Sequence, residues 1–222
     1  MIVVHHLENS RSQRVLWLLE ELGLPYEIKH YKRNPTTMRA PPELRAVHPL
    51  GKSPVVTDGD KTLAESGAIV EYLAETYGGG RFVPPAGSPE SLNYRYFMHF
   101  AEGSMMSPLL MKLIFSRLPA GAPALVRPIA RAIANKALST VAQPQIDQQL
   151  EFLEGELAQR DWFAGPEFSA ADIQMSFPLE AAAARGGLDA RFPRLTDFLK
   201  RIHARPAYAR ALERGGPYAL LS

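Results

Sequence analysis

The first 31 residues contain the pattern that most constrains the fold, two short strands separated by one amphipathic helix. Residues 2–7 and 26–31 predict the strands, and apolar residues recur at helical spacing between them. Gly23, followed by Pro25, predicts the end of the helix. A strand, a helix and a strand within about 30 residues require parallel pairing through a right-handed crossover. The chain is therefore expected to begin with a βαβ unit.

Two further strands and a second long helix complete this N-terminal pattern. Residues 53–57 predict a strand, which a turn joins to a hairpin partner at 61–64. A helix with an apolar face follows directly. The proline-rich residues 32–50 have room for one helical turn near 43–47. The predicted order is β-α-β, a connection that contains a short helix, and then β-β-α.

A glycine- and proline-rich stretch divides the 222 residues into two predicted domains. Three glycines at 78–80 and the proline-rich run 84–89 indicate a linker. Every apolar pattern after the linker has helical spacing, so we expect an α/β domain followed by an all-α helical bundle. The predicted segments are an N-terminal domain, 1–79, a linker, 80–90, and a helical domain, 91–222.

The chain contains no cysteine, and this absence excludes several kinds of chemistry. A disulfide framework, a thiolate metal site and a cysteine nucleophile are all ruled out. The formal net charge of +2 gives no reason to expect nucleic-acid binding. No apolar run approaches the ~20 residues that span a bilayer, and no signal-peptide pattern follows Met1. We therefore expect a cytoplasmic protein that does not bind membranes, in which any thiol is supplied from outside.

Three junctions carry residues that suit an anionic ligand. They are Asn9-Ser10-Arg11-Ser12 between a strand and a helix, Ser53-Pro54 before a strand, and Glu65-Ser66 at a helix start. Free backbone amides and the positive end of a helix stabilise anions, including a thiolate. Taken singly, the serines at 10, 12 and 66 are better explained as helix caps, and a cis bond before Pro54 is uncommon. Together they lie where an open sheet forms its ligand crevice.

Four segments, in order and at matching spacing, resemble the cytosolic-type glutathione S-transferases. They are residues 6–26, 49–56, 63–73 and 168–175, the last with a capping-box pattern. The first segment is similar to the active-site turn of bacterial, serine-type members. The resemblance implies a thioredoxin-like glutathione-binding domain, then an all-α domain that contributes a pocket for an apolar electrophile. It also implies a homodimer.

The same resemblance assigns the catalytic turn. Ser10 falls where serine-type members keep the hydroxyl that hydrogen-bonds the glutathione thiolate. Ser12 is the alternative, and some relatives align their hydroxyl with Asn9. Glutathione is the expected cosubstrate, and no metal is expected, since His5 and His6 are strand neighbours that point to opposite faces.

The binding residues follow in the same way. Pro54, preceded by Ser53, falls on the cis-proline, and Val55 falls where backbone groups pair with the cysteinyl part of glutathione. Lys52 falls near the glycine carboxylate. The γ-glutamyl end is assigned to Glu65 and Ser66, and the electrophile pocket to Met105, Met106 and Leu109.

The expected reaction is attack by the glutathione thiolate on a small hydrophobic electrophile. A free thiol has a pKa of about 8.5, and hydrogen bonds plus a helix end would lower it by ~1–2 units. A glutathione-dependent disulfide or peroxide reductase is an alternative, because bound glutathione can do redox chemistry without a protein thiol. A non-catalytic binding module with the same fold is another. A glutathione-dependent isomerase is less favoured, because the Ser-Ser-Cys motif of such enzymes is absent.

One stretch of the helical domain has a strong charge bias. Residues 103–146 contain no acidic residue and carry five basic ones, Lys112, Arg117, Arg127, Arg131 and Lys136. This segment would suit an anionic ligand or a membrane surface. The simpler interpretation, which we favour, is a solvated basic face on a pair of helices.

Overall fold

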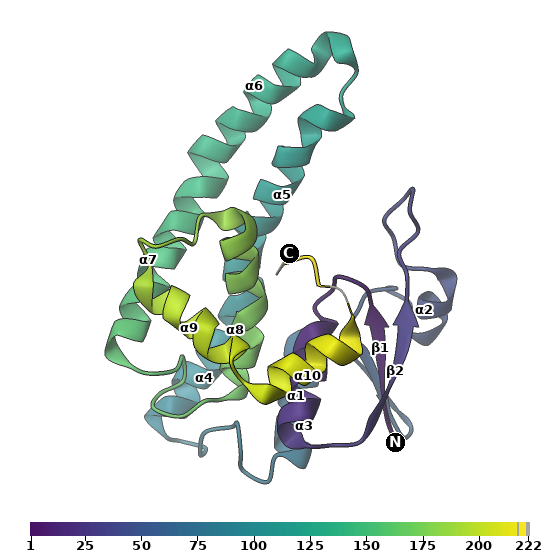
Figure 1. Ribbon diagram of the computed structural model, residues 1–222, viewed down its shortest axis with the longest axis vertical. Helices are drawn as coiled ribbons and strands as arrows, with labels where there is room; N and C mark the ends of the chain where they lie inside the picture. The colour runs from purple at the N-terminus through teal and green to yellow at the C-terminus, as the bar shows by residue number, and fades with distance from the viewer. Residues whose placement is uncertain (217, 221–222) are drawn as a thin grey trace.

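A four-stranded sheet in the order β2-β1-β3-β4 forms the N-terminal part of the chain (Figure 1). The computed structural model describes residues 1–216 and 218–220. Strand β1 (Ile2–Leu7) pairs parallel with β2 (Tyr26–Tyr31) and antiparallel with β3 (Val55–Asp58), which forms a hairpin with β4 (Lys61–Ala64). The predicted βαβ unit and the hairpin are confirmed.

Three helices cover the two faces of this sheet. Helices α1 (Ser12–Leu22) and α3 (Ser66–Tyr77) bury apolar residues against one face, and α2 (Pro42–Val47) covers the other. Because neighbouring strand residues alternate between faces, His6 lies on the α1 face. His5 lies on the opposite face, where its Nδ1 is 2.9 Å from the Tyr31 hydroxyl.

The rest of the described chain is helical, as predicted. Its helices are α4 (Pro89–Phe100), α5 (Met106–Gly121), α6 (Arg127–Ala137), α7 (Gln143–Gln159), α8 (Ala170–Ala181), α9 (Pro193–His203) and α10 (Pro206–Gly215). Three π-helical turns extend α4, α6 and α8, at Ala101–Met105, Leu138–Ala142 and Ala182–Gly186, and a 3-10 turn at Ala124–Val126 precedes α6.

Helix α8 is buried along its whole length at the centre of the helical part (Figure 1). Its start is fixed by the predicted capping box, in which the Asp172 carboxylate accepts from the Ser169 N–H at 2.8 Å. The same carboxylate accepts from the Phe163 N–H at 2.9 Å, which ties the preceding loop to the helix. This helix presents Gln174 and Phe177 toward α1 and the candidate site.

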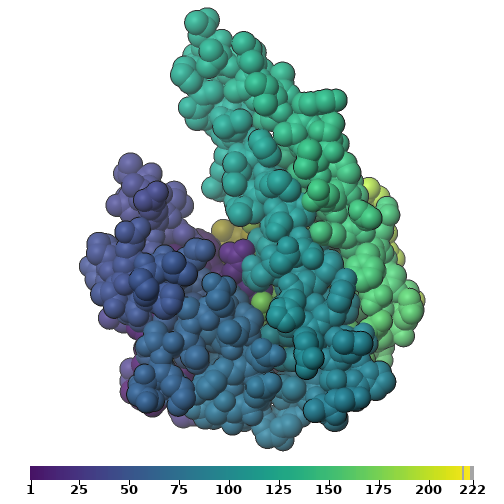
Figure 2. Space-filling view, turned by 180° about the vertical axis from the view of Figure 1, so that it is seen from behind, coloured from purple at the N-terminus to yellow at the C-terminus, as the bar shows by residue number. Residues whose placement is uncertain are grey.

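Helices α5 and α6 extend together well beyond the rest of the molecule (Figures 1 and 2). This hairpin carries the basic stretch noted above, and its apolar side chains include Leu125, which is 92% exposed, with Ile129 and Ile133 also exposed. In the described part of the chain, no helix is both long and apolar enough to cross a membrane.

Candidate active site

The two helices that face the site begin differently from the capping prediction. Helix α1 has Arg11 as its N-cap, and Ser12 is its first helical residue. Helix α3 has Glu65 as its N-cap, in the left-handed region at φ 72°, and Ser66 is its first helical residue. Neither N-cap residue makes a side-chain capping bond, so Ser12 and Ser66 are not N-caps. Ser10 precedes the N-cap of α1, and its Oγ still accepts from the N–H of the first helical residue, Ser12, at 3.3 Å.

Ser53 anchors the start of β3 to the end of β1. Its Oγ donates to the carbonyl of His5 at 2.9 Å and accepts from the N–H of Leu7 at 3.1 Å. The peptide bond between Ser53 and Pro54 is cis, as the resemblance implies. Since its only proton is used by His5, the Ser53 hydroxyl acts toward any further partner as an acceptor.

A chain of three polar side chains runs from the sheet to the surface at the β1–α1 turn. The His6 Nδ1 lies 2.8 Å from the Ser12 Oγ, which lies 2.7 Å from the Ser10 Oγ. The Ser10 Oγ also lies 3.3 Å from the Ser53 Oγ and accepts from the Ser12 N–H at 3.3 Å. Ser12 is fully buried, whereas Ser10 keeps 7% of its surface exposed. Of the two, Ser10 is the one that lines a cavity.

His6 is uncharged at physiological pH. Burial lowers its pKa to about 4, and the neighbouring His30 acts in the same direction. Helix α10 contributes to this burial, because Gly215 allows it to approach α1 closely. A Cβ at Gly215 would lie 2.8 Å from the Oε1 of Gln13 and 3.5 Å from the His6 ring.

The side chain of Asn9 is hydrogen-bonded to the C-terminal segment. It lies in the left-handed region at φ 51°, and its Oδ1 accepts from the N–H of Ala219 at 2.7 Å. Its carbonyl faces the guanidinium of Arg33, at 3.5 Å from Nη2. The Asn9 side chain is therefore used by Ala219 and not by the neighbouring hydroxyl groups. The hydroxyl groups that contact one another at this turn are those of Ser10, Ser12 and Ser53.

Two adjoining cavities lie beside these hydroxyls. We call the first the Glu65 cavity; it measures about 360 Å³ and lies between the sheet and the start of α5. It is lined by Arg11, His48, Leu50, Lys52, Ser53, Pro54, Ala64, Glu65, Ser66, Glu102 and Leu110. The N-terminus of α3 opens into it, so it combines an exposed carboxylate with the positive end of a helix.

We call the second the Arg39 cavity; it measures about 420 Å³ and lies between the β1–α1 turn, α2 and α8. It is lined by Leu7, Asn9, Ser10, Arg11, Arg33, Arg39, Ala40, Arg45, Leu50, Gly51, Lys52, Ser53 and Phe177. Both cavities share Arg11, Leu50, Lys52 and Ser53. Figure 2 shows the molecule hollowed between the N-terminal part, purple to blue, and the teal α5.

The structure brings most of the predicted site residues together, but not all of them. Around the two cavities lie Ser10, Lys52, Ser53, Pro54, Glu65 and Ser66. Val55 is buried within β3, between β1 and β4. Met105, Met106 and Leu109 are buried in the main core and line neither cavity. Their neighbour Leu110, half exposed on the same helix, does line the Glu65 cavity.

Sequence reasoning missed an ion-pair cluster that connects the β1–α1 turn to the helical domain. Arg14 is 1% exposed, donates to the Gln174 carbonyl at 2.6 Å and pairs with Glu102. The Nε of Arg11 donates to the same carboxylate at 2.9 Å, and both guanidiniums lie over the Phe177 ring. Burial would raise the pKa of Glu102, but Arg14 and Arg11 hold it below its ordinary value.

A signal for this cluster was present in the sequence. Arg14 precedes Leu18 by four residues and Trp17 by three, so it lies on the apolar stripe of its helix. A charged residue on such a stripe requires a buried partner of opposite charge. Glu102, the last acidic residue before the charge-biased segment 103–146, supplies that partner.

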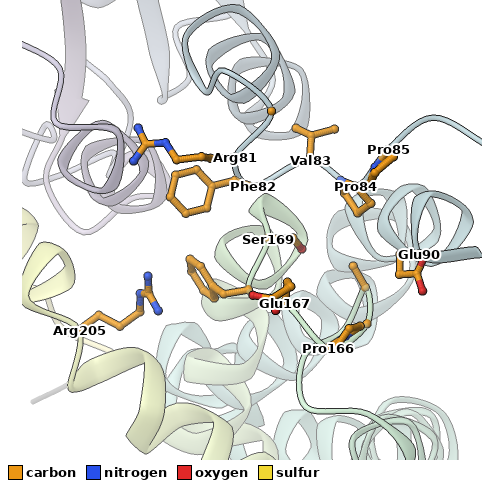
Figure 3. A pocket seen from close by; sticks show the side chains of 14 residues that line it. Arg81, Phe82, Val83, Pro84, Pro85, Glu90, Pro166, Glu167, Ser169 and Arg205 are labelled. Atoms are coloured by element: carbon orange, nitrogen blue, oxygen red, sulfur yellow. The ribbon is translucent and has the colours of Figure 1, made fainter. Parts of the chain in front are cut away.

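A larger cavity, of about 640 Å³, lies elsewhere and contains none of the predicted site residues (Figure 3). It is bordered by the linker from Gly80 to Pro85, by Glu90, by residues 164–169 and by Arg205. The Arg205 guanidinium stacks 3.8 Å from the centre of the Phe168 ring. The candidate site is therefore chosen on the convergence of hydroxyls, cations and a helix N-terminus, and not on cavity size.

The described residues, 1–216 and 218–220, include no group of three or more His, Asp or Glu side chains placed to hold a metal ion.

Comparison with known proteins places this chain in a family. Residues 1–75 match the model for the N-terminal domain of glutathione S-transferases, and residues 113–206 match the C-terminal domain. Glutathione S-transferase 3 of Schizosaccharomyces pombe is 37% identical over 96% of this chain and 88% of its own. Glutathione S-transferase 1 of Saccharomyces cerevisiae is 34% identical over 96% of this chain and 95% of its own.

A solved structure agrees with these matches along the whole chain. The crystal structure of a glutathione S-transferase from Actinobacillus pleuropneumoniae is 34% identical, covers 100% of this chain and 96% of its own, and superposes with a TM-score of 0.81. The order of a thioredoxin-like domain and an all-α domain is thus confirmed. The chain belongs to the glutathione S-transferase family and is a glutathione S-transferase enzyme.

Proposed function

We propose that this enzyme uses a serine-type site, in which Ser10 stabilises the glutathione thiolate for attack on a small electrophile. One observation carries the proposal: Ser10 is the outer end of a buried hydroxyl chain and, although only 7% exposed, lines a cavity beside the cis-proline segment. Ser12 is fully buried behind it and acts through Ser10. Ser53 is committed to His5 and Leu7.

The Glu65 cavity suits the three charged groups of glutathione. The exposed Glu65 carboxylate pairs with the γ-glutamyl amine, and the first amides of α3 at Ser66 receive the adjacent carboxylate. Lys52 receives the glycine carboxylate. The main chain at the cis Ser53–Pro54 bond, which lines this cavity, receives the cysteinyl part; Val55 follows it between its strand partners His5 and Ala64 and lines neither cavity. In this arrangement the sulfur lies toward Ser10.

The hydroxyl chain can orient its protons toward the sulfur. Because His6 is neutral, its Nδ1 either carries a proton or accepts one, according to the tautomer. With the proton on Nδ1, His6 donates to Ser12 and Ser12 donates to Ser10. The Ser10 hydroxyl donates to the Ser53 Oγ in this structure, at 3.3 Å, and would turn this proton to the sulfur when glutathione binds. Each bond in such a chain polarises the next, so the buried members strengthen Ser10 as a donor.

The size of the effect follows from one charge-assisted hydrogen bond. A hydrogen bond to a charged acceptor contributes about 1.5–3 kcal/mol, which is equivalent to about 1–2 pKa units. A free thiol with a pKa of about 8.5 is then lowered to a pKa of about 6.5–7.5, so that roughly a quarter to three quarters of it is thiolate at pH 7. The sulfur forms a bond to an electrophilic carbon, and the leaving group departs with the electron pair of the bond that breaks.

Retention on immobilised glutathione, followed by an assay with a neutral chloronitrobenzene, tests this function. We expect retention, elution by free glutathione and release of chloride. Retention without turnover of aryl halides, peroxides or disulfides would support a binding module and contradict the proposal. Turnover of peroxides or disulfides alone would support the reductase alternative.

We also propose a homodimer, with residues 1–79 as the glutathione-binding domain, 80–90 as the linker and 91–222 as the domain that completes the acceptor pocket. Exposed apolar side chains on the neighbouring helices α4 and α7 support a dimer: Leu92, Tyr96 and Phe152. Light scattering of the wild type and of Tyr96→Glu tests it, because burial of a new charge would shift the variant toward monomer. We expect the enzyme in the cytoplasm.

A further inference from the structure

The tip of the α5–α6 hairpin projects away from the rest of the molecule (Figures 1 and 2). It consists of residues 118–126, Leu-Pro-Ala-Gly-Ala-Pro-Ala-Leu-Val, and none of them has a charged or hydrogen-bonding side chain. Leu125 is 92% exposed, and Leu118 and Val126 are exposed as well. Exposed apolar side chains gathered in one place mark a surface that contacts another protein or a membrane.

Positively charged side chains flank this tip on both of its helices. Arg117 directly precedes it and Arg127 directly follows it, with Arg131 and Lys136 further along α6. In the part of the chain that the structure describes, none of these cations forms an ion pair. Since residues 103–146 contain no acidic residue, the tip is an apolar surface bordered by uncompensated positive charge.

A hollow between the two helices adjoins the tip and measures about 530 Å³. The residues that line it are one cation, Arg117, and five residues without polar side chains: Ile114, Leu118, Gly121, Ala122 and Ala130. An acyl chain can lie against the apolar part of this lining while an anionic headgroup pairs with the arginine. The hollow therefore suits a lipid better than it suits a polar molecule.

The backbone of the tip is also suited to an apolar environment. Pro119 and Pro123 have no N–H group. The N–H of Ala122 donates to the Pro119 carbonyl at 3.3 Å, and the N–H of Val126 donates to the Pro123 carbonyl at 3.1 Å. The Arg127 guanidinium donates to the Ala122 carbonyl at 3.4 Å. Because an unpaired polar group is costly to move out of water, these bonds lower the cost of burying the tip.

A second copy of this chain suits the tip less well than an anionic surface does. Contact between two tips would bring their uncompensated cations together, which is unfavourable. The apolar patch proposed for the dimer lies on α4 and α7, away from the tip (Figure 1). The sequence alone favoured a solvated basic face, because a charge bias does not show which apolar side chains the fold leaves exposed.

We propose that the tip of the α5–α6 hairpin inserts into the headgroup region of an anionic lipid bilayer, so that the enzyme binds the membrane peripherally. Leu118, Leu125 and Val126 reach the boundary with the acyl chains, and Arg117 and Arg127 contact lipid phosphates. This replaces the expectation that the protein does not bind membranes. It goes beyond the proposed function, because the tip lines neither the Glu65 cavity nor the Arg39 cavity.

Flotation of the enzyme with lipid vesicles tests the proposal, using phosphatidylcholine vesicles with and without phosphatidylglycerol. We expect the wild type to bind the vesicles that contain phosphatidylglycerol, and added salt to weaken this binding. Leu125→Asn should weaken binding about tenfold, because it removes an apolar side chain from the bilayer contact. Arg127→Gln combined with Arg131→Gln should weaken it about fivefold for each lost cation.

Arg194→Gln is the matched control, because it removes an exposed arginine of α9 and should leave vesicle binding unchanged. Turnover in solution should be the same in the wild type and in all variants, since their altered side chains line neither site cavity, and this shows that they are folded.

Three results would overturn the inference. The first is no binding of the wild type to the anionic vesicles at low salt. The second is binding that is equal for the wild type and Leu125→Asn, or equal for vesicles with and without phosphatidylglycerol. The third is self-association of the wild type that Leu125→Asn abolishes in light scattering, without vesicle binding, which would assign the tip to a second copy. Vesicle binding is measured without substrate, so its failure is distinct from a failure of the proposed function.

Discussion

Replacing Glu102 by glutamine tests how the helical domain holds the catalytic turn. Glu102 lies on the π-helical turn after α4, and its carboxylate pairs with Arg14 and Arg11 of the β1–α1 turn. Arg14 is almost completely buried, and its remaining acceptor is the carbonyl of Gln174. The substitution keeps the shape of the side chain and removes its charge.

The expected loss follows from the burial of the two partners. Removing one member of a buried ion pair costs about 3–5 kcal/mol, because the other charge stays buried without compensation. Glu102 keeps 32% of its side chain exposed, so water reaches this pair, and the glutamine oxygen still accepts one hydrogen bond. We therefore expect Glu102→Gln to lower the free energy of unfolding by about 2–3 kcal/mol.

Urea unfolding at neutral pH measures this loss, with Asp197→Asn as the matched control. Asp197 pairs with Arg201 one helical turn away on an exposed surface. Asp197→Asn should therefore lower the free energy of unfolding by less than about 0.5 kcal/mol. Because the pKa of Glu102 is lowered in the folded state, its contribution is complete above the ordinary pKa of 4.5 and is lost as the pH falls below it. The free energies of unfolding of the wild type and of Glu102→Gln should therefore approach each other in acid. A difference at neutral pH no larger than that of the control would refute the reasoning.

Two further predictions concern Asp172 and His6. Asp172→Ala leaves the N–H groups of Ser169 and Phe163 without their acceptor, so the free energy of unfolding should fall by about 3 kcal/mol. Asp172→Asn should lower it by less. Equal losses for the two variants in urea titrations would contradict this. His6 has a pKa of about 4 in the folded protein against an ordinary value of 6.5. Between these pH values the unfolded chain binds a proton at His6 that the folded protein does not bind. The free energy of unfolding therefore falls by up to about 3 kcal/mol as the pH drops from 6.5 to 4. In His6→Gln this component should disappear, and an unchanged pH dependence of unfolding would show that His6 does not cause it.

The sequence was sufficient for the topology because local patterns determine it. The spacing of apolar residues predicted the βαβ unit, and a parallel pair joined by one helix has a single common handedness. The capping box at Ser169 and Asp172 was likewise predicted, since the residues that form it are three positions apart. Patterns of this kind are contained within one element or between neighbouring elements.

The details of the site depended on contacts that no local pattern records. Helix α3 has its N-cap one residue before Ser66, at Glu65, whose left-handed backbone its residue type does not predict. Apolar periodicity places Met105 and Met106 on a buried face, but it does not distinguish a core from a cavity wall. The arginines of the Arg39 cavity come from an irregular loop and α2, and only the fold brings them beside Ser10.

The central claim is that Ser10 lowers the pKa of the bound glutathione thiol. Ultraviolet absorbance of the thiolate, titrated against pH in the enzyme–glutathione complex, measures this pKa directly. For the wild type we expect a pKa about 1–2 units below that of the free thiol, and for Ser10→Ala a return by a similar amount with little change in glutathione affinity. Ser12→Ala should give a smaller rise, because Ser12 acts through Ser10. An identical thiol pKa in wild type and Ser10→Ala would contradict the account.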